Sequence, residues 1–436
     1  MKKIKLIINT LLASVIFLSA FISADKKTDD EVPRYKLIPS EKFYFNSFVD
    51  CNMAEAWVGD TFRIFPGKYG EDPVWGYAHD LKFADGATAE EAFLAEKNSF
   101  KNPVMPPNVL PTENGLHGAV WFETIYQDKK DASGKTLYAI YHNENYPATL
   151  PYNIATGEGY INKNWPRGLT DSNSAAAVCR IGIMKSVDGG HSWINKGIFI
   201  EDLQPRMILK PHNTSVTFAG GVGDPSAVVS ENYLYLFYGE YGYHGAYNAA
   251  KYNPETEWSG QCISIARISL NDLDNPAGKA KRWDGKSFNA DYNGIGEPVS
   301  SLQISMNEGG GPASSPISKF YWGPSVSWNT YLNCWVMLMA RAEGPSWKGG
   351  SIWISFNKNV DLGEGNNSQQ WSKPQMLLNR EGHTIWYPSL QPTNSSGDIS
   401  QKNTCLKLGK TARLFFKDMH GDSSEYISEY KIAFEK

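Results

Sequence analysis

The chain has 436 residues, of which 13% are aromatic and 20% are charged, and its formal net charge at pH 7 is −4. This balance of charge, without a basic cluster, argues against nucleic acid as a partner. With 39 Gly, 24 Pro and few helical patterns, the composition favours an all-β fold, a class in which one domain can hold a chain of this length.

The N-terminus has the pattern of a secretory signal peptide. Lysines at positions 2, 3 and 5 precede an apolar run from Leu6 to Ile22, and small residues before Asp25 provide a cleavage site. We therefore expect a signal peptide over 1–24, a linker over 25–33 and a single domain over 34–436. The run is at the short limit for a membrane span, so we expect a secreted or periplasmic protein without membrane attachment.

The first unit of the mature chain is an expected β-hairpin, in which an apolar run ends at Val58 and the chain turns at Gly59-Asp60. Asp50 lies near the start of this unit. An Ala- and Glu-rich stretch, Ala87 to Lys97, predicts the one short helix. A second unit then begins at Leu116–Glu123 and returns over Thr136–His142.

A strand cassette with an internal Pro defines the third unit and returns twice. In the first copy, Asp224-Pro225 leads into an apolar strand, Glu231-Asn232 makes a tight turn, and an aromatic strand returns to Gly239. Because Pro lacks an N–H, we expect it to be the first residue of the strand, with Asp224 at the end of the sheet. The cassette recurs at Tyr321–Trp328 and Ile385–Leu390.

The units together predict a β-propeller. The third, fourth and fifth units begin near Gly221, Phe320 and Thr384, so that five four-stranded units follow one another along the chain. The last unit needs a strand from the N-terminal segment to close the ring. A five-bladed propeller is the predicted fold, and a six-bladed, sialidase-like propeller is the alternative.

A turn motif in the second unit supports this fold. Residues Ser186–Trp193 match the pattern Ser/Thr-x-Asp-x-Gly-x-x-Trp, known as the Asp box of β-propellers. The turn requires Gly for left-handed backbone, Asp to accept backbone N–H groups, and Trp to fill the space between blades. We therefore interpret Asp188 as a structural residue.

The cysteines and histidines indicate neither a disulfide framework nor a zinc motif. The five Cys lack CxxC spacing and four of them lie in or beside apolar runs, so we expect buried free thiols. The eight His are scattered without i,i+4 pairs. We expect no required cofactor and no metal among the catalytic residues.

The motifs resemble those of the five-bladed β-propeller glycosidases, which include arabinanases, β-xylosidases and fructan hydrolases. The Gly-Asp-Pro at Asp224 is similar to their x-Asp-Pro motif. The resemblance implies that Asp50 is a general base or nucleophile and that Asp224 stabilises the transition state and tunes the acid. It also allows a structural calcium ion in the channel. Where these families carry the acidic Glu, this chain has Trp322, so the candidates for the acid are Glu343 and Glu240.

The repeat predicts where the chemistry lies. In an antiparallel unit the start of the first strand and the end of the second meet at one edge, and these edges converge at the mouth of a propeller channel. We expect Glu123, deeper along its strand, to be a paired buried carboxylate or a group behind the site. The candidate substrate-binding residues at the mouth are His117, His142, Trp322, Arg341, Trp386 and Tyr387.

A secreted glycoside hydrolase acting on a polysaccharide or oligosaccharide through two carboxyl groups is the predicted function, with carbohydrate as the partner and a monomer as the expected state. A non-catalytic, glycan-binding propeller is the alternative, since Asp224 can simply bond local backbone donors, and Glu240 and Glu343 can be solvated charges. A sialidase-like exo-glycosidase comes third, because no spacing singles out three Arg for a substrate carboxylate.

Overall fold

The computed structural model describes the following residues: 32–45, 49–72, 76–94, 100–107, 116, 118–145, 152–153, 158–159, 177–201, 218–240, 262–294, 296–310, 319–343, 347–363, 368–394, 398 and 400–436. The predicted signal peptide lies outside these residues. The chain divides into two compact units, Met1–Arg34 and Tyr35–Lys436, and the sheets considered below belong to the second. Among the described residues, no helix has the length and apolar character to cross a bilayer.

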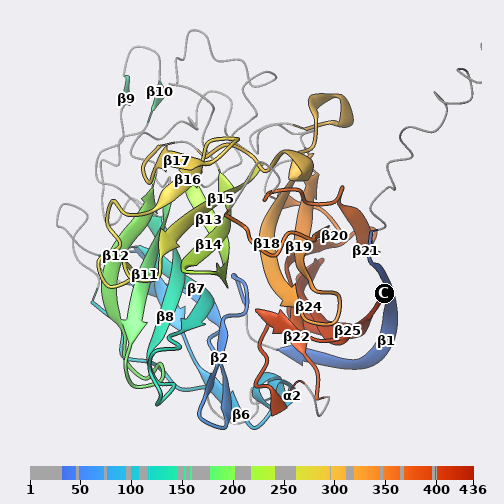
Figure 1. Ribbon diagram of the computed structural model, residues 1–436, viewed down its shortest axis with the longest axis horizontal. Coiled ribbons are helices and arrows are strands. Elements are labelled where there is room, and N and C mark those ends of the chain that lie inside the picture. The colour runs from blue at the N-terminus through green and yellow to red at the C-terminus, as the bar shows by residue number, and fades with distance from the viewer. Residues whose placement is uncertain are drawn as a thin grey trace, which may run out of the picture. The chain divides into compact units, whose positions relative to one another are not determined.

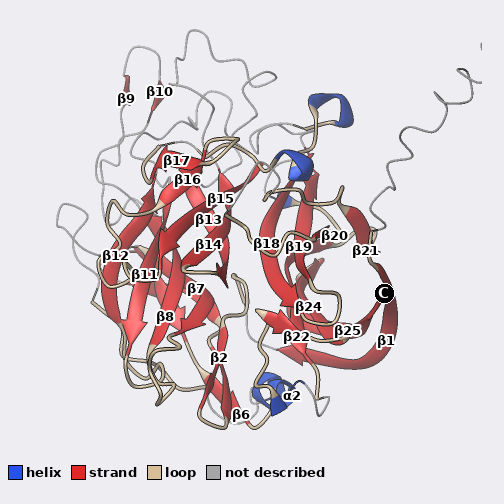
Figure 2. Cartoon of the chain, viewed as in Figure 1, coloured by secondary structure: helices blue, strands red, loops and turns tan. Residues whose placement is uncertain are grey.

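Strands make up nearly all of the regular structure (Figure 2), in agreement with the predicted all-β class. The first part of the chain forms small antiparallel sheets and one short helix. The hairpin predicted around Gly59-Asp60 is present, since Val58 pairs with Thr61. The helix begins two residues later than predicted, and its predicted last residues lie outside the described residues. The elements are β2 (Glu55–Val58), β3 (Thr61–Ile64), β4 (Gly67–Asp72), β5 (Gly76–Leu81), β6 (Ala84–Gly86) and helix α2 (Ala89–Leu94).

Two antiparallel groups follow and share a nine-stranded sheet. They join where Ala177–Cys179 of the first group runs parallel to the start of the second. The first group contains β7 (Ala119–Gln127), β8 (Leu137–Asn145), β11 (Ala177–Ser186) and β12 (Ile194–Glu201). The second contains β13 (Phe218–Ser230), β14 (Tyr233–Glu240), β15 (Cys262–Ser269), β16 (Lys281–Trp283) and β17 (Phe288–Asp291). The two-residue strands β9 (Tyr152–Asn153) and β10 (Glu158–Gly159) pair with each other.

The C-terminal half forms two further sheets, preceded by two 3-10 turns, η3 (Ser300–Leu302) and η4 (Met306–Glu308). In the last sheet the N-terminal strand β1 lies beside β25, as the sequence predicted for closure of the last unit (Figure 1). One sheet comprises β18 (Lys319–Asn329), β19 (Cys334–Glu343), β20 (Ser351–Asn357), β21 (Gln375–Asn379) and β23 (Lys407–Leu408). The other comprises β1 (Arg34–Phe45), β22 (Thr384–Pro392), β24 (Thr411–His420) and β25 (Ser423–Glu435).

Apolar clusters lie between successive groups of strands. Phe65, from the loop after β3, contacts Phe122 of β7 and Trp193 beside β12. The first and last groups also pack together, because Phe93 of α2 stacks on Phe415 of β24 with ring centroids 4.2 Å apart. The free thiols are as predicted: four are buried, and Cys405 is partly exposed. Sheets that share apolar clusters with their neighbours hold their first strands in fixed positions.

The prediction that Pro opens each strand of the cassette is wrong. Strand β13 begins at Phe218, and Pro225 lies inside it, at a register shift between Gly223 and Ser226. A β-bulge accommodates a residue without an N–H, because it interrupts the ladder of hydrogen bonds. The same shift surrounds Pro324 in β18 and Pro388 in β22. The repeated motif is therefore a bulge within a strand.

The turn at Ser186–Trp193 is closed by Asp188. Its carboxylate accepts hydrogen bonds from the backbone N–H and the hydroxyl of Ser192, at 3.0 and 2.6 Å. The two glycines that follow have φ of +77° and +94°, and a Cβ at Gly190 would lie 2.6 Å from Phe65 Cζ. This segment requires glycine for both reasons.

We expect Asp188→Ala to lower the free energy of unfolding by about 1–3 kcal/mol, because donors in the turn lose a charged acceptor. Urea denaturation monitored by fluorescence measures this change. Asp60→Ala is the matched control, since the Asp60 side chain is 99% exposed, and it should change stability by less than about 0.5 kcal/mol. Equal stability of the Asp188 variant and the wild type would contradict the role of the turn.

Candidate active site

Bulges in the first strands of the groups turn polar side chains toward one place. In β7 the register shifts between Phe122 and Thr124, which places Glu123 in a bulge. In β13 and β22 the bulged residues Asp224 and Tyr387 have φ of +46° and +49°. Such conformations are unfavourable for residues other than glycine and occur preferentially at functional sites. The backbone thus indicates a site where these strands bulge.

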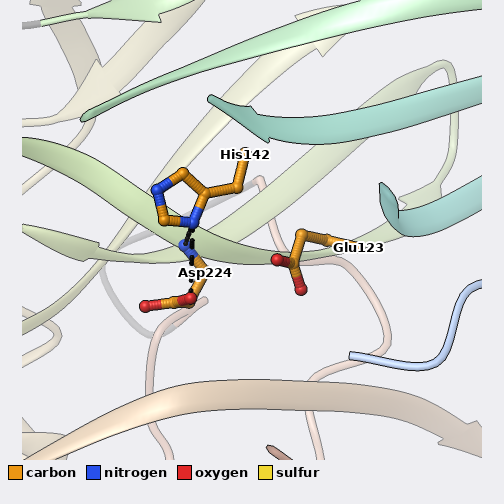
Figure 3. Close-up of side chains that lie close together, drawn as sticks. All are labelled: Glu123, His142 and Asp224. Atoms are coloured by element: carbon orange, nitrogen blue, oxygen red, sulfur yellow. Dashed lines mark hydrogen bonds and ion pairs between the residues drawn. The ribbon is translucent and has the colours of Figure 1, made fainter. Parts of the chain in front are cut away.

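Glu123 and Asp224 converge with a third side chain, His142 (Figure 3). One donor atom from each of Glu123 on β7, His142 on β8 and Asp224 on β13 lies within 4.8 Å of the other two, and all three residues are buried. His142 Nδ1 lies 3.4 Å from Asp224 Oδ1. The backbone N–H of Asp224 also faces His142 Nδ1 at 3.4 Å. This nitrogen accepts that N–H when it is unprotonated and donates to the carboxylate when it is protonated, so it holds one of the two groups at a time.

Glu123 is held as a neutral acid. Burial raises the pKa of its carboxyl group well above the ordinary range, and the nearby charges of Asp224 and Asp50 raise the pKa further. Its Oε2 accepts a hydrogen bond from the backbone N–H of Asn52 at 2.8 Å. Its Oε1 is buried and has no hydrogen-bond partner among the described residues. A carboxyl group with a raised pKa and an unpartnered oxygen is suited to act as a general acid.

His142 responds to its carboxylate neighbours. Burial lowers the pKa of the imidazole, but the hydrogen bond and the charge of Asp224 outweigh burial, and Glu144 and Asp50 add to them, so the pKa lies above its ordinary value. When Nδ1 carries a proton, it faces Asp224 Oδ1 as a donor at 3.4 Å. His142 Nε2 is buried and lacks a partner within the described segments.

Asp50 forms an ion pair with a buried lysine. Lys417 Nζ on β24 donates to Asp50 Oδ1 at 2.8 Å. The Asp50 side chain is 21% exposed, whereas that of Lys417 is 1% exposed. Burial lowers the pKa of Lys417, and the charge of Asp50 opposes this effect. Asp50 is therefore the carboxylate of the site with access to water.

Aromatic side chains connect the two acidic ends of the site. Tyr387 donates its hydroxyl to Asp224 Oδ1 at 3.4 Å. The Trp322 ring meets the rings of Tyr387 and Trp386 edge to face, at 5.5 and 5.6 Å between centroids. Lys417 Nζ lies 4.6 Å from the Trp386 ring centroid. This chain of contacts reaches from Asp224 to Asp50, so first strands of separate groups contribute to one site.

Six of the predicted site residues thus belong to one network: Asp50, His142, Asp224, Trp322, Trp386 and Tyr387. The remaining predicted site residues are placed differently. Glu240 forms a buried ion pair with Arg282 on β16 and accepts the Gly296 N–H at 3.1 Å. We therefore correct its assignment as a candidate acid, because its carboxylate is bonded to Arg282 and Gly296 inside the protein.

Glu343, the other candidate acid, has a side chain that is 51% exposed and lies 3.6 Å from Arg341. Arg341 in turn lies 5.0 Å from the centroid of the Trp353 ring. Neither residue forms a hydrogen bond, ion pair or ring contact with the trio Glu123, His142 and Asp224 in the described part of the chain. An exposed carboxyl group such as that of Glu343 is a solvated charge. His117 lies outside the described residues.

Known proteins resemble the chain only distantly. No family model matches the sequence, and no curated protein does. An α-L-arabinofuranosidase from Podospora anserina, solved with cellotriose, is 9% identical, with 93% of this chain and 98% of that chain covered and a TM-score of 0.45. An exo-1,5-α-L-arabinanase from a bovine ruminal metagenomic library is 11% identical over 89% and 93% of the two chains, with a TM-score of 0.42. These likenesses are too distant to assign a family or an activity.

Two residues of this network were not among the predicted site residues. Glu123 is a buried carboxyl group that accepts a backbone N–H, as expected, but a bulge with no Pro to mark it also brings it beside His142 and Asp224. Lys417 follows an apolar run like many solvated lysines, and only the fold places it beside Asp50. The signal in the sequence was position: Glu123 and Asp224 both lie in the first strands of their units, and Lys417 lies near the end of a second strand.

The donor set of the trio also bears on metal binding. One imidazole nitrogen and two carboxylates are ligands that zinc accepts, whereas calcium takes six to eight oxygen ligands. The described residues of the trio therefore do not match the calcium ion suggested by resemblance, and that ion stays a prediction. An acid–base role and an ion-binding role for the trio predict opposite responses to a chelator.

Proposed function

We propose that the protein is a secreted glycoside hydrolase with a five-bladed β-propeller over 34–436, acting on a polysaccharide or oligosaccharide. The observation that carries the proposal is Glu123: a buried carboxyl group whose pKa is raised well above its ordinary range, with an unpartnered Oε1 among the described residues, next to the Asp224 carboxylate. Two carboxyl groups with pKa values pushed apart by their surroundings divide acid and base roles between them.

The residues have distinct roles in this mechanism. Glu123 donates its proton to the leaving oxygen as the glycosidic C–O bond breaks. The charge of Asp224 keeps Glu123 protonated, and His142 and Tyr387 hold Asp224 in place. Asp50 accepts a proton from the water whose oxygen bonds to the anomeric carbon, since Asp50 is the more exposed carboxylate. Trp322 and Trp386 supply apolar surface for the sugar ring.

The test is hydrolysis of arabinans, xylans and fructans by the purified mature protein, measured as released reducing ends. We expect release from at least one of these substrates, and about a 10²–10⁴-fold lower rate for Asp50→Asn, because the attacking water loses its base. Asp60→Asn is the control, as the same substitution at an exposed aspartate. Proton NMR of the first product reports the anomer, and inversion is expected for a water activated by Asp50.

Dialysis against EDTA separates the acid–base role from a metal-dependent one, and we expect full activity to remain. Binding of these glycans without release of reducing ends would favour the glycan-binding alternative. That alternative has one observation in its support, the presence of Trp322 where the resemblance places an acid. An unchanged rate for Asp50→Asn would remove Asp50 from the mechanism.

A further inference from the structure

Lys417 occupies a position that is unusual for a lysine. It lies directly opposite Trp386 in the pairing of β24 with β22, and its Nζ is 4.6 Å from the Trp386 ring centroid. The ammonium group donates to Asp50 Oδ1 at 2.8 Å. A cation on an aromatic face with a carboxylate in front of it is held on two sides.

The exposure of the pair is asymmetric. The Lys417 side chain is 1% exposed and that of Asp50 is 21% exposed, so Asp50 is the more accessible member of the pair. Because the ammonium group donates to the more accessible carboxylate, Lys417 can influence the reaction through Asp50.

We propose that Lys417 is a positioning residue that orients the Asp50 carboxylate as the base of the glycosidase reaction. This inference rests on the proposed function. A carboxylate that is bonded at one oxygen by a fixed ammonium group retains its second oxygen for water, in one orientation.

Other ionisable groups near Asp50 do not substitute for Lys417. Glu123 is a neutral acid, and the Cys51 thiol has a pKa well above its ordinary value because it is buried. His142 interacts with Asp50 through its charge, but its hydrogen bond is to Asp224. Among the described residues, Lys417 is thus the cation that contacts the Asp50 carboxylate directly.

The test is Lys417→Met, which retains an apolar stem over Trp386 and removes the charge. We expect kcat to fall about 10–100-fold with little change in KM, because positioning affects the transition state more than substrate binding. A merely structural role would instead lower the amount of folded protein or raise KM together with the loss of kcat.

Lys402→Met is the matched control, since Lys402 pairs with Asp60 at 2.9 Å on the surface, and it should leave kcat and KM unchanged. The double variant Asp50→Asn/Lys417→Met should be no slower than Asp50→Asn alone, because Lys417 acts through Asp50. An unchanged kcat in Lys417→Met, or additive losses in the double variant, would overturn the proposal.

The proposal can still be tested if Lys417→Met fails to fold. The defect would then be an unpaired Asp50 carboxylate, and the double variant, which lacks that charge, should fold. A double variant that also fails to fold would assign Lys417 to packing and overturn the proposal. Failure of the proposed function is a separate result, seen as wild-type protein that releases no sugar from any of the three substrates.

Discussion

Glu123→Gln is expected to lower kcat on a polysaccharide by about 10²–10⁴-fold, the usual contribution of a general acid. The amide retains the shape of the neutral acid and can still accept the Asn52 N–H, but it has no acidic proton to donate. This loss of activity should therefore come from a substitution that preserves the fold. Rates of reducing-end release and a thermal unfolding curve measure both quantities.

The nature of the leaving group provides a sharper test of the same residue. The nitrophenolate of a nitrophenyl glycoside leaves without help from an acid. The rate on such a substrate should therefore fall far less in Glu123→Gln than the rate on the polysaccharide. Glu343→Gln is the control, since that carboxyl group is half exposed. Equal losses on both substrates would show that Glu123 does not deliver the proton.

The pH profile provides a third readout of Glu123. Its pKa is raised above the ordinary range by burial first and by Asp224 and Asp50 next. The acid stays protonated, and thus active, at pH values where an exposed glutamic acid has lost its proton. We expect Asp224→Asn to move the alkaline limb to lower pH, because removal of that charge lowers the pKa of Glu123.

Local patterns predicted the strands and turns well. The turns at Gly59-Asp60 and Glu231-Asn232 follow from turn residues between apolar runs, and the strand taken from the N-terminus was expected from the closure of a ring of units. These features depend on a few neighbouring residues, so the sequence contains them. Asp50 and Asp224 were predicted as site residues from the repeat and the resemblance, and that assignment remains a prediction.

Side-chain partners could not be predicted in the same way. Glu240 resembled a candidate acid until its partner Arg282 was known, 42 residues away along the chain. Glu123 becomes part of the site through a bulge in β7, which depends on the strands packed around it. The assignments of Glu240 and Glu123 changed for one physical reason: the burial of a carboxyl group and the partner it bonds, and not its sequence position, set its pKa.

A second buried glutamate, outside the site, joins the first and last parts of the domain. Glu55 on β2 accepts a hydrogen bond from the backbone N–H of Cys405, and Glu55 Oε2 is buried with no partner in the described chain. Nearby, Trp57 Nε1 donates to Asn403 O at 2.7 Å. The hairpin β2–β3 is thus attached to the segment before β23.

Glu55→Gln is expected to stabilise the protein at alkaline pH. Burial raises the pKa of Glu55 from 4.5 to about 8, against hydrogen bonds from Cys405 and Gln391 that lower it. Below pH 4.5 both the folded and the unfolded protein carry a neutral Glu55, so its titration costs nothing. As pH rises toward 8 only the unfolded chain ionises, and wild-type stability falls by about 1.4 kcal/mol per pH unit.

The glutamine at position 55 does not ionise, so its advantage over the wild type should grow by about 3–5 kcal/mol between pH 4.5 and pH 8. Its amide can still accept the Cys405 N–H, and its NH₂ group lies near Gln391, whose Oε1 is a buried acceptor without a partner among the described residues. Urea denaturation of both proteins at the two pH values measures the difference, with Glu343→Gln as the exposed control. An advantage that is the same at both pH values would mean that Glu55 is already ionised in the folded protein. The hairpin would then be held by a buried charge, and not by a neutral acid.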